Sequence, residues 1–392
     1  MINRKHIYLI LCSLIFMFLC FFINVKIGKS ISGPCERCHT MHNYQNGTIV
    51  VSGGPYRALT KGDCAICHTG SSPDAISNIP YVNFTSDPSY DFGSTSEHVL
   101  AGGSFYWQEG KCGNGTAALG DVCVHDVDFF NSEGPYEPPG YDPNNYPVNG
   151  VTRNSTWGKQ LTCAGTYGCH GDPSKEDPFA AISGAHHQNV CCNMTNSNYN
   201  CTGDHVWNSY RFLLGIWGTE DPDWEKTWSA FDHNGYYAID LYNDTVTSPP
   251  TLDSHSINYL CGECHGKFHW ETNNATLSEK YASPWRRHPT DIDMNWVSGK
   301  EYGNYPGIFN GTVGGVGYYF PEVPVGNAAG EVKSQVLRGP NTDDAIVLCI
   351  SCHRAHGSPY ADLLRWPYDE CTCGNSNNTS TKCGCFACHT SK

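Results

Sequence analysis

Five segments of the chain share the spacing Cys-X-X-Cys-His. Two cysteines at this spacing lie on one helical turn, where both can reach the vinyl groups of one porphyrin, and the next imidazole can bind its iron. Zinc sites and disulfides use the same residue types, but five copies in one chain favour covalently bound haem c. The segments are Cys35/Cys38/His39, Cys64/Cys67/His68, Cys261/Cys264/His265, Cys349/Cys352/His353 and Cys385/Cys388/His389.

A sixth segment is irregular, because five residues instead of two separate Cys163 from Cys169-His170. Two of these five are glycines, which adopt turn conformations at low cost and would let the extra residues loop out. The alternative is a small disulfide loop beside a free histidine. The Cys-His-Gly ending, and a position that fills the long gap between the second and third regular motifs, favour a sixth haem.

Histidine is the only residue abundant enough to supply second axial ligands to six irons. Methionine is scarce after the leader, whereas eleven histidines remain outside the motifs and the leader. Irons with two histidine ligands have no open position for a substrate, so we expect electron transfer and not catalysis. The eleven are His42, His98, His125, His186, His187, His205, His233, His255, His269, His288 and His356.

His42 lies three residues after His39 and therefore on the same helical face. It is on the wrong side of that haem to supply the second ligand, but it can reach the iron of a neighbouring haem. The alternative is an exposed histidine or one bonded to a propionate. The same arrangement recurs in His353/His356 and His265/His269.

The elements that must position these residues are short. Glycine (41) and proline (23) are plentiful, mean hydropathy is −0.42, and periodic apolar stretches are few. We therefore expect one domain, residues 33–392, that is mostly irregular, with short α-helices and small β-hairpins around haems that fill the interior. The aromatic segment 209–228 is expected to cover porphyrin faces as packing, not as a site.

Residues 1–32 have the pattern of a secretory signal peptide. A basic start at Arg4 and Lys5 is followed by an apolar run, and Ser30 and Ser32 precede Gly33 like a cleavage site. The run could also remain as an N-terminal membrane anchor. In either case the chain is exported, so that its other cysteines meet an oxidising compartment.

Eight cysteines belong neither to the leader nor to a motif. We expect local disulfides between Cys112 and Cys123, between Cys201 and one of Cys191/Cys192, and between Cys383 and one of Cys371/Cys373. A net charge of −14 argues against nucleic acid as a partner. Frequent Asn-X-Ser/Thr sequences spread along the chain favour a glycosylated surface protein, among them Asn46, Asn83, Asn114, Asn154, Asn193, Asn243, Asn274, Asn310 and Asn378.

The chain resembles the extracellular hexahaem c-type cytochromes that polymerise into filaments. The resemblance rests on CERCHTMHN (35–43), WRRHP (285–289), CISCHRAHGSPY (349–360) and the motif near the C-terminus, with EHVLAGG (97–103) as a fainter match. The number and order of the motifs agree as well. Residues 105–260 do not align.

This resemblance implies a stacked haem chain, self-assembly into a helical homopolymer, and electron transfer outside the cell to a mineral, an electrode or a partner cell. It also implies that His42 ligates a haem of the adjacent subunit, the one on Cys349/Cys352/His353. His98, His288 and His356 match second ligands within the subunit. The chain departs from the family in the irregular spacer and in the second motif, which no histidine closely follows. His186 or His187 would supply that ligand, with His233 in reserve.

Two other functions remain open. The chain could be a carrier in the periplasm or at the cell surface that never polymerises, with His42 bound within its own subunit. It could also be a multihaem reductase, which needs an iron with an open position. No Cys-X-X-Cys-Lys motif is present, and the surplus of histidines argues against the reductase.

Overall fold

The structure is a computed structural model. It describes residues 33–71, 79–92, 99–108, 112, 122–130, 137–141, 157–182, 203–241, 253–269, 288, 290–296, 305, 317–336, 342–371 and 383–389. The expected leader, 1–32, lies outside these residues. Among the helices described, none combines the length and apolar character that a membrane crossing requires.

Most of the described helices are short, as expected, and several of them carry motif cysteines or lie beside them. The longest is α4 (Ile257–His269), which departs from helical angles at His265 (φ −111°, ψ 38°). The other α-helices are α2 (Ala65–His68), α3 (Pro178–Ala181) and α6 (Cys349–Cys352). The 3-10 turns are η1 (Cys35–Arg37), η2 (Arg57–Leu59), η3 (Phe105–Trp107), η5 (Asp128–Phe130), η7 (Val206–Asn208), η8 (Tyr210–Phe212), η9 (Met294–Trp296), η10 (Ala361–Leu363), η11 (Tyr368–Glu370) and η12 (Gly384–Ala387).

The described strands pair in twos. β3 and β4 are parallel, and the other four pairs (β1 with β2, β5 with β6, β7 with β9, β8 with β10) are antiparallel. Among these pairs only β1 and β2 form a tight hairpin, so the expected hairpins are largely replaced by pairs between distant segments. The strands are β1 (Tyr44–Gln45), β2 (Thr48–Ile49), β3 (Thr69–Gly70), β4 (Asn83–Phe84), β5 (Gly218–Thr219), β6 (Gly235–Tyr236), β7 (Gly317–Tyr318), β8 (Val325–Gly326), β9 (Gln335–Val336) and β10 (Ile346–Val347).

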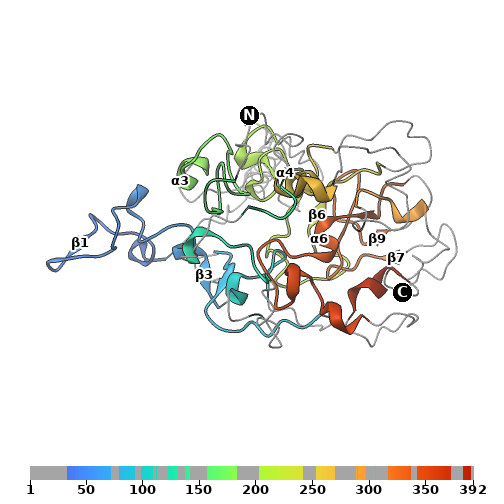
Figure 1. The fold of residues 1–392 in the computed structure, drawn as a ribbon, viewed down its shortest axis with the longest axis horizontal. Helices are drawn as coiled ribbons and strands as arrows, with labels where there is room; N and C mark the ends of the chain where they lie inside the picture. Colours follow the sequence, from blue (N-terminus) through green and yellow to red (C-terminus); the bar gives the residue numbers. More distant parts are fainter. Residues whose placement is uncertain are drawn as a thin grey trace, which may run out of the picture.

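The β1–β2 hairpin forms the tip of an arm that projects from the body of the molecule (Figure 1). Asn46 and Gly47 occupy its turn with φ of 50° and 79°, the left-handed pair that a two-residue hairpin requires. The arm, residues 40–56, carries exposed apolar side chains, among them Met41 (84% exposed) and Ile49 (65%).

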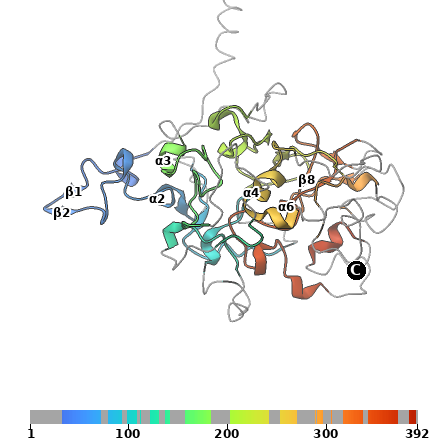
Figure 2. The same ribbon diagram turned by 45° about the horizontal axis from the view of Figure 1, so that its top comes forward.

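The molecule is elongated, with the arm at one end and the C-terminus at the other. Figure 1 places both along its longest axis, and Figure 2 shows the same order after a turn about that axis. α2 lies toward the arm, α4 and α6 pack together in the middle, and the last residues lie at the far end. The order of the motifs in the chain is thus roughly their order along the molecule.

The buried side chains of the described residues form three separate clusters instead of one core. One surrounds Met294, Tyr305 and Trp366, and partly buried motif cysteines such as Cys352 and Cys388 pack against it. A second lies under α4 and α6. A third is centred on Phe105 and Trp107. Side chains therefore supply more of the interior than we expected, but in pieces that lie behind the motifs.

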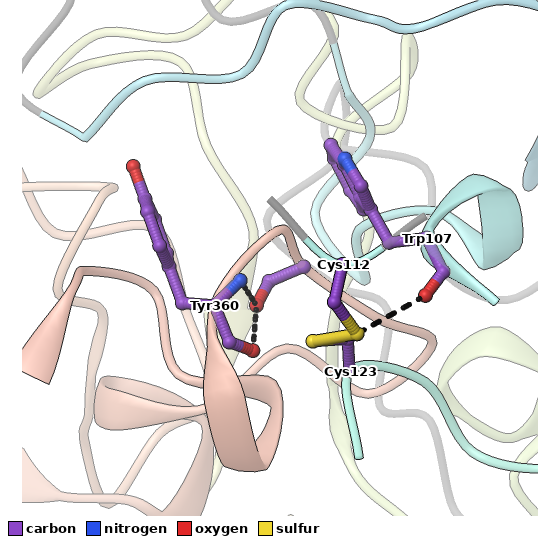
Figure 3. The surroundings of a disulfide bond; sticks show 5 residues. Trp107, Cys112, Cys123 and Tyr360 are labelled. Atoms are coloured by element: carbon purple, nitrogen blue, oxygen red, sulfur yellow. Dashed lines mark hydrogen bonds between the residues drawn. A yellow bond between two sulfur atoms is a disulfide. The ribbon is translucent and has the colours of Figure 1, made fainter. Parts of the chain in front are cut away.

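The expected disulfide Cys112–Cys123 is present, and Cys383 pairs with Cys371, one of the two partners that the sequence left open for it. Figure 3 shows the first, where the Cys112 sulfur faces the Trp107 carbonyl oxygen at 3.7 Å. It joins Cys112, which follows η3 in the chain, to the segment that bears His125. The third expected pair, which involves Cys191, Cys192 and Cys201, lies outside the described residues.

Candidate haem-binding sites

The motif histidines share one backbone geometry. In five of the six motifs the histidine N–H donates to the carbonyl oxygen of the first cysteine, and in the four regular ones both cysteines and the histidine therefore lie on a single tight turn. The donors and acceptors are His39 and Cys35 (2.9 Å), His68 and Cys64 (3.2 Å), His170 and Cys163 (3.0 Å), His353 and Cys349 (3.1 Å), and His389 and Cys385 (2.9 Å).

The motif that contains Cys264 differs from the other five. Cys261 and Cys264 are half-buried, and both lie inside the thirteen-residue helix α4 instead of on an isolated turn. The helix leaves helical angles only at His265, directly after Cys264. This helix is longer than the others because it begins before the motif, and it packs on α6. The two cysteines still lie one helical turn apart, as haem attachment needs.

The irregular motif reaches the shared turn despite its longer spacer. The N–H of His170 still meets the Cys163 carbonyl, and the inserted residues form a loop closed by Gly168 N–H to Gly165 O (3.0 Å) and Gly165 N–H to His170 O (2.9 Å). Gly165 has a φ of +90°, and a Cβ at Gly168 would lie 2.6 Å from the Ala164 nitrogen. The two glycines thus permit the loop for the reason expected from the sequence.

A second shared feature fixes the imidazole rings. In five motifs the histidine Nδ1 lies within hydrogen-bond distance of a main-chain carbonyl from another segment. A carbonyl only accepts, so Nδ1 carries the proton and Nε2 keeps its lone pair for a metal. The pairs are His39 with Ala58 (3.0 Å), His68 with Pro80 (2.8 Å), His170 with Arg211 (2.9 Å), His265 with Pro139 (2.8 Å) and His353 with Asp362 (2.7 Å).

Three of these carbonyls come from the same kind of turn, which we call the latch turn (η2, η8 and η10). Ala58, Arg211 and Asp362 are the middle residues of these turns, and each has left-handed angles, with φ of 58°, 49° and 56°. This conformation aims the carbonyl at the imidazole of a motif outside the turn. No residue pattern indicated the latch turns in advance.

Each latch turn also holds the residue that follows the histidine. Its N–H donates to the next carbonyl of the turn: Thr40 to Leu59 (2.7 Å), Gly171 to Phe212 (2.7 Å) and Arg354 to Leu363 (2.8 Å). The segment 209–228, expected only to pack, therefore also orients His170. These paired bonds hold the ring against rotation, as second-shell partners do in metal sites.

Three pairs of histidine rings lie at the separation of two ligands on one metal. An imidazole nitrogen binds a metal at about 2 Å, so rings on opposite sides of one ion have centroids roughly 6 Å apart. The observed centroid separations are 6.3 Å for His170 and His356, 6.2 Å for His265 and His125, and 6.1 Å for His389 and His288. Each pair joins a motif histidine to one outside the motifs.

His125 is the residue that sequence reasoning passed over among the eleven spare histidines. Its Nδ1 donates to the carbonyl of Ala355 (2.6 Å), which leaves Nε2 for a ligand, as in the motif histidines. The segment around His125 is held in place by the Cys112–Cys123 disulfide and by the buried cluster that contains Cys123, Val124 and Val127. Because this contact joins residues far apart in the chain, only the fold reveals it.

The paired histidines are held in the neutral form that metal binding requires. Burial lowers the pKa of His356 to about 3 and that of His125 to about 4, with further lowering by neighbouring imidazoles. Burial also lowers the pKa values of His170 and His265.

Other predicted ligands take different places. His42 is exposed on the arm, with Nδ1 donating to the Tyr44 carbonyl (3.1 Å). His233 is fully buried, stacks on Tyr319, and has both nitrogens near main-chain carbonyls, of Asn234 (2.6 Å) and Lys333 (3.3 Å). His269 is described only as the last residue of α4. His98, His186 and His187 lie outside the described residues.

Successive motifs lie close to one another. Burial raises the pKa of the Cys67 thiol and the nearby Cys38 thiol raises it further, while the nearby Cys163 thiol lowers the pKa of Cys64. Burial raises the pKa of Cys388, and the nearby Cys352 thiol raises it further. These effects link the first, second and third motifs, and the fifth and sixth.

The donor set fits haem c better than a smaller metal. Each site offers two cysteine thiols and one imidazole, and the two disulfides of the described residues include none of these twelve cysteines. Among the described residues, the sole compact group with metal-binding side chains is Cys371, Cys383 and Cys385, and two of these already share a disulfide. Zinc is therefore a poor fit at the motifs.

Comparisons with known proteins give only a distant likeness. No family model matches the chain, and no curated protein matches it. One solved structure, the outer membrane cytochrome S filament from Geobacter sulfurreducens, has 18% identity and a TM-score of 0.39 and covers 87% of this chain and 85% of its own. A cryo-EM structure of OmcS nanowires from Geobacter sulfurreducens has 17% identity and a TM-score of 0.36, with coverage of 89% and 88%. These values establish neither a shared fold nor a shared function.

Proposed function

We propose that this chain is an extracellular electron-transfer protein that holds six haems c and assembles head-to-tail into a filament. The cysteine pairs of the six motifs, Cys261 and Cys264 in α4 included, would bind the haems, and the motif histidines would be the first axial ligands. His356, His125 and His288 would be the second ligands opposite His170, His265 and His389. His98 and one of His186/His187 remain proposed second ligands toward the arm.

The observation that carries this proposal is the separation of about 6 Å between three motif histidine rings and three other histidine rings, and electrostatic effects between groups of neighbouring motifs support it. In the first three motifs, the Cys38 thiol adds to the effect of burial and raises the pKa of Cys67, and the Cys163 thiol lowers the pKa of Cys64. The His356 ring, 6.3 Å from His170, is electrostatically coupled to His125, which lies 6.2 Å from His265. In addition to burial, the charge of His353 in turn lowers the pKa of His265, and that of Cys352 raises the pKa of Cys388. Every motif takes part in this series of effects, which therefore runs through the molecule.

Haem supplies a reversible one-electron change when bound. The protein's part is to orient most of the imidazoles through their Nδ1–H groups, to keep the buried ones neutral, and to supply a histidine to each axial position. An axial position that is occupied by a histidine cannot bind a substrate, so the arrangement favours electron transfer over catalysis.

Assembly through the arm is supported by what lies on two different surfaces. His42 is exposed, and its Nδ1–H is already bonded, so its Nε2 is free to bind a metal outside its own subunit. The exposed side chains of Met41, Tyr44 and Ile49 would be buried by a partner. His353 is also exposed, and its Nδ1–H donates to the Asp362 carbonyl (2.7 Å), which leaves Nε2 as the nitrogen for a metal. A contact between two different surfaces can repeat without closing, and so gives a fibre.

The test of assembly is the variant His42→Ala, observed by electron microscopy with haem staining. We expect six haems by intact mass but no filaments, since only the bridging ligand is lost. His205→Ala is the matched control, because His205 is also exposed but lies against Trp207 and is not part of the arm. Filaments of normal length from His42→Ala would make the chain a carrier that does not polymerise through this residue.

The test of electron transfer is the spin state of the oxidised assembled protein. With two histidines on every iron, the electronic and electron paramagnetic resonance spectra should be low-spin throughout. A stoichiometric high-spin component would indicate an open iron and would favour the reductase instead.

A further inference from the structure

A cluster of three sulfurs lies at the C-terminal end of the molecule, outside the roles assigned above. Cys371 and Cys383 form a disulfide, and the Cys385 sulfur lies 4.0 Å from that of Cys371. All three sulfurs fall within 4.8 Å of one another. Cys385 carries a thiol and is the first of the two cysteines in the last motif.

The fold holds these sulfurs together by packing on both sides. The Cys371 N–H donates to the Tyr368 carbonyl (3.0 Å) at the end of η11, and Cys383 directly precedes η12. Gly384 lies so close to Trp366 that any side chain there would overlap the indole ring. Both Cys371 and Cys385 pack against the cluster that contains Trp366. The contact between the disulfide and the motif thiol is therefore built into the interior.

We propose that these residues form a thiol–disulfide exchange site that acts on the exported chain before haem is attached to Cys385. The Cys385 thiolate attacks the sulfur of Cys371, a Cys371–Cys385 bond forms, and the Cys371–Cys383 bond breaks. Cys383 leaves as a thiolate and takes up the proton that Cys385 gave up. One disulfide replaces another, so no external oxidant or reductant is needed, and the reverse step restores the first pairing.

This exchange would shield Cys385 while it waits for haem. An exposed thiol in an oxidising compartment forms unwanted disulfides or is oxidised further. In a disulfide with Cys371, the Cys385 sulfur is protected from these reactions. The neighbouring Cys383 thiolate can release it again by attacking Cys371. The thioether formed with haem removes the attacking thiol and leaves Cys371–Cys383 as the final bond. The inference rests on the proposed role of Cys385 in binding haem.

The first test is the disulfide map of the full-length chain, exported from cells that lack the haem-attachment machinery and trapped with N-ethylmaleimide. We expect tandem mass spectrometry to find both Cys371–Cys383 and Cys371–Cys385 in this chain, and only Cys371–Cys383 in the haem-loaded protein. If the haem-free chain contains only Cys371–Cys383, the exchange does not occur.

The second test counts haems by intact mass in two variants that differ at one position. In Cys373→Ser/Cys383→Ser no Cys371–Cys383 bond can form, so the oxidants of the exporting compartment join the Cys371 and Cys385 thiols, no Cys383 thiolate releases them, and the protein should carry one haem fewer than the wild type. In Cys371→Ser/Cys373→Ser/Cys383→Ser the trap is gone, and the full number of haems should return. Full loading of both variants overturns the exchange, whereas a wild-type protein without haem at Cys385 overturns the proposed function of that motif.

Discussion

At the scale of single residues, the recurrent feature is an imidazole whose Nδ1 is committed to a carbonyl. It appears in the motif histidines, in His125 and in His42, where the acceptors are otherwise unrelated segments. The bond leaves Nε2 as the nitrogen available to a metal and resists rotation of the ring. A histidine that meets this condition is a better ligand candidate than one that is merely near a motif. By this criterion His233, with both nitrogens near carbonyls, is a weak candidate. His356, whose buried Nδ1 has no such bond, is supported instead by the 6.3 Å separation of its ring from that of His170.

Replacing His125 by Ala should open one iron. Its ring lies 6.2 Å from that of His265, and we expect one haem to become high-spin in the oxidised protein while the haem number by mass stays the same. His255→Ala is the matched control, because that ring is already bonded to Asp253 (2.8 Å) and stacks on Trp217. An unchanged low-spin spectrum in His125→Ala would remove His125 from the set of ligands.

Replacing Arg354 by Ala should destabilise the protein strongly. This guanidinium is 1% exposed, donates to the carbonyls of Leu100 (3.2 Å) and Ala101 (3.0 Å), and lies over the Tyr90 ring. We expect a loss of about 2–4 kcal/mol in the free energy of unfolding from these bonds and the lost packing.

The matched control for Arg354 is Arg57→Ala, measured by the same denaturant titration. Arg57 forms an exposed ion pair with Asp177 (2.8 Å), and such pairs contribute roughly 0–1 kcal/mol. Equal losses in the two variants would contradict the structural role given to Arg354.

At the scale of elements, short turns position the side chains that helices and sheets position elsewhere. The latch turns η2, η8 and η10 join motifs to segments outside them, and each uses a left-handed residue that is not glycine. For such a residue this conformation costs roughly 1–2 kcal/mol. Bonds on both sides of the histidine stabilise it, so the turn and the motif depend on each other.

Ala58 provides the clearest test of a latch turn. Ala58→Gly relieves the left-handed strain at φ 58° and should raise the free energy of unfolding by about 0.5–1 kcal/mol, because the glycine entropy offsets part of the gain. Ala58→Val adds a β-branched side chain at the same angles and should destabilise the protein. Thermal unfolding of the haem-loaded variants gives both values. A stabilising Ala58→Val would show that the turn is not left-handed in solution.

At the scale of the whole molecule, the dominant properties are the difference between the two ends of the long axis and the negative net charge. The arm and the last motif lie at opposite ends, and Figure 2 shows the remaining motif elements between them. The net charge of −14 makes subunits repel one another, and salt screens that repulsion. A contact through an apolar arm and a histidine ligand is compatible with this charge.

The contribution of Asp221 to stability should fall as the pH rises from about 4 to about 8, whereas the buried histidines, whose pKa values are lowered, contribute in the opposite direction below about pH 6.5. Burial, aided by the neighbouring Asp223 carboxyl, raises the pKa of Asp221 to about 8. The folded state therefore holds a proton that the unfolded chain loses near its ordinary pKa of about 4, so folding is favoured at low pH and loses this contribution as pH rises through that window. Thermal unfolding at a series of pH values measures the slope.

Asp221→Asn removes the titrating group and should flatten this part of the pH profile. Asp87→Asn is the matched control, because Asp87 is exposed and accepts the nearby Ser89 N–H (2.8 Å). A profile for Asp221→Asn that parallels the wild type would assign the pH dependence to other groups.

The sequence alone determined the local chemistry. Cysteine and histidine spacing is a property of one turn of chain, so the five regular motifs could be read directly, and the glycines of Cys163–Cys169 explained how a longer spacer reaches the same turn. The disulfides Cys112–Cys123 and Cys371–Cys383 could be predicted because their partners are close in sequence. The low apolar periodicity likewise predicted short elements and little regular structure.

Tertiary structure decided everything that joins distant segments. The carbonyls of Arg211 and Asp362 orient histidines through left-handed turns that no residue type announces, and His125 meets His265 across the fold. The long helix around Cys264 and the three side-chain clusters behind the motifs were also hidden, since the residues that stabilise them are scattered along the chain. Spacing fixes what one turn can bind, whereas the choice of partner between turns depends on packing, which a local pattern does not record.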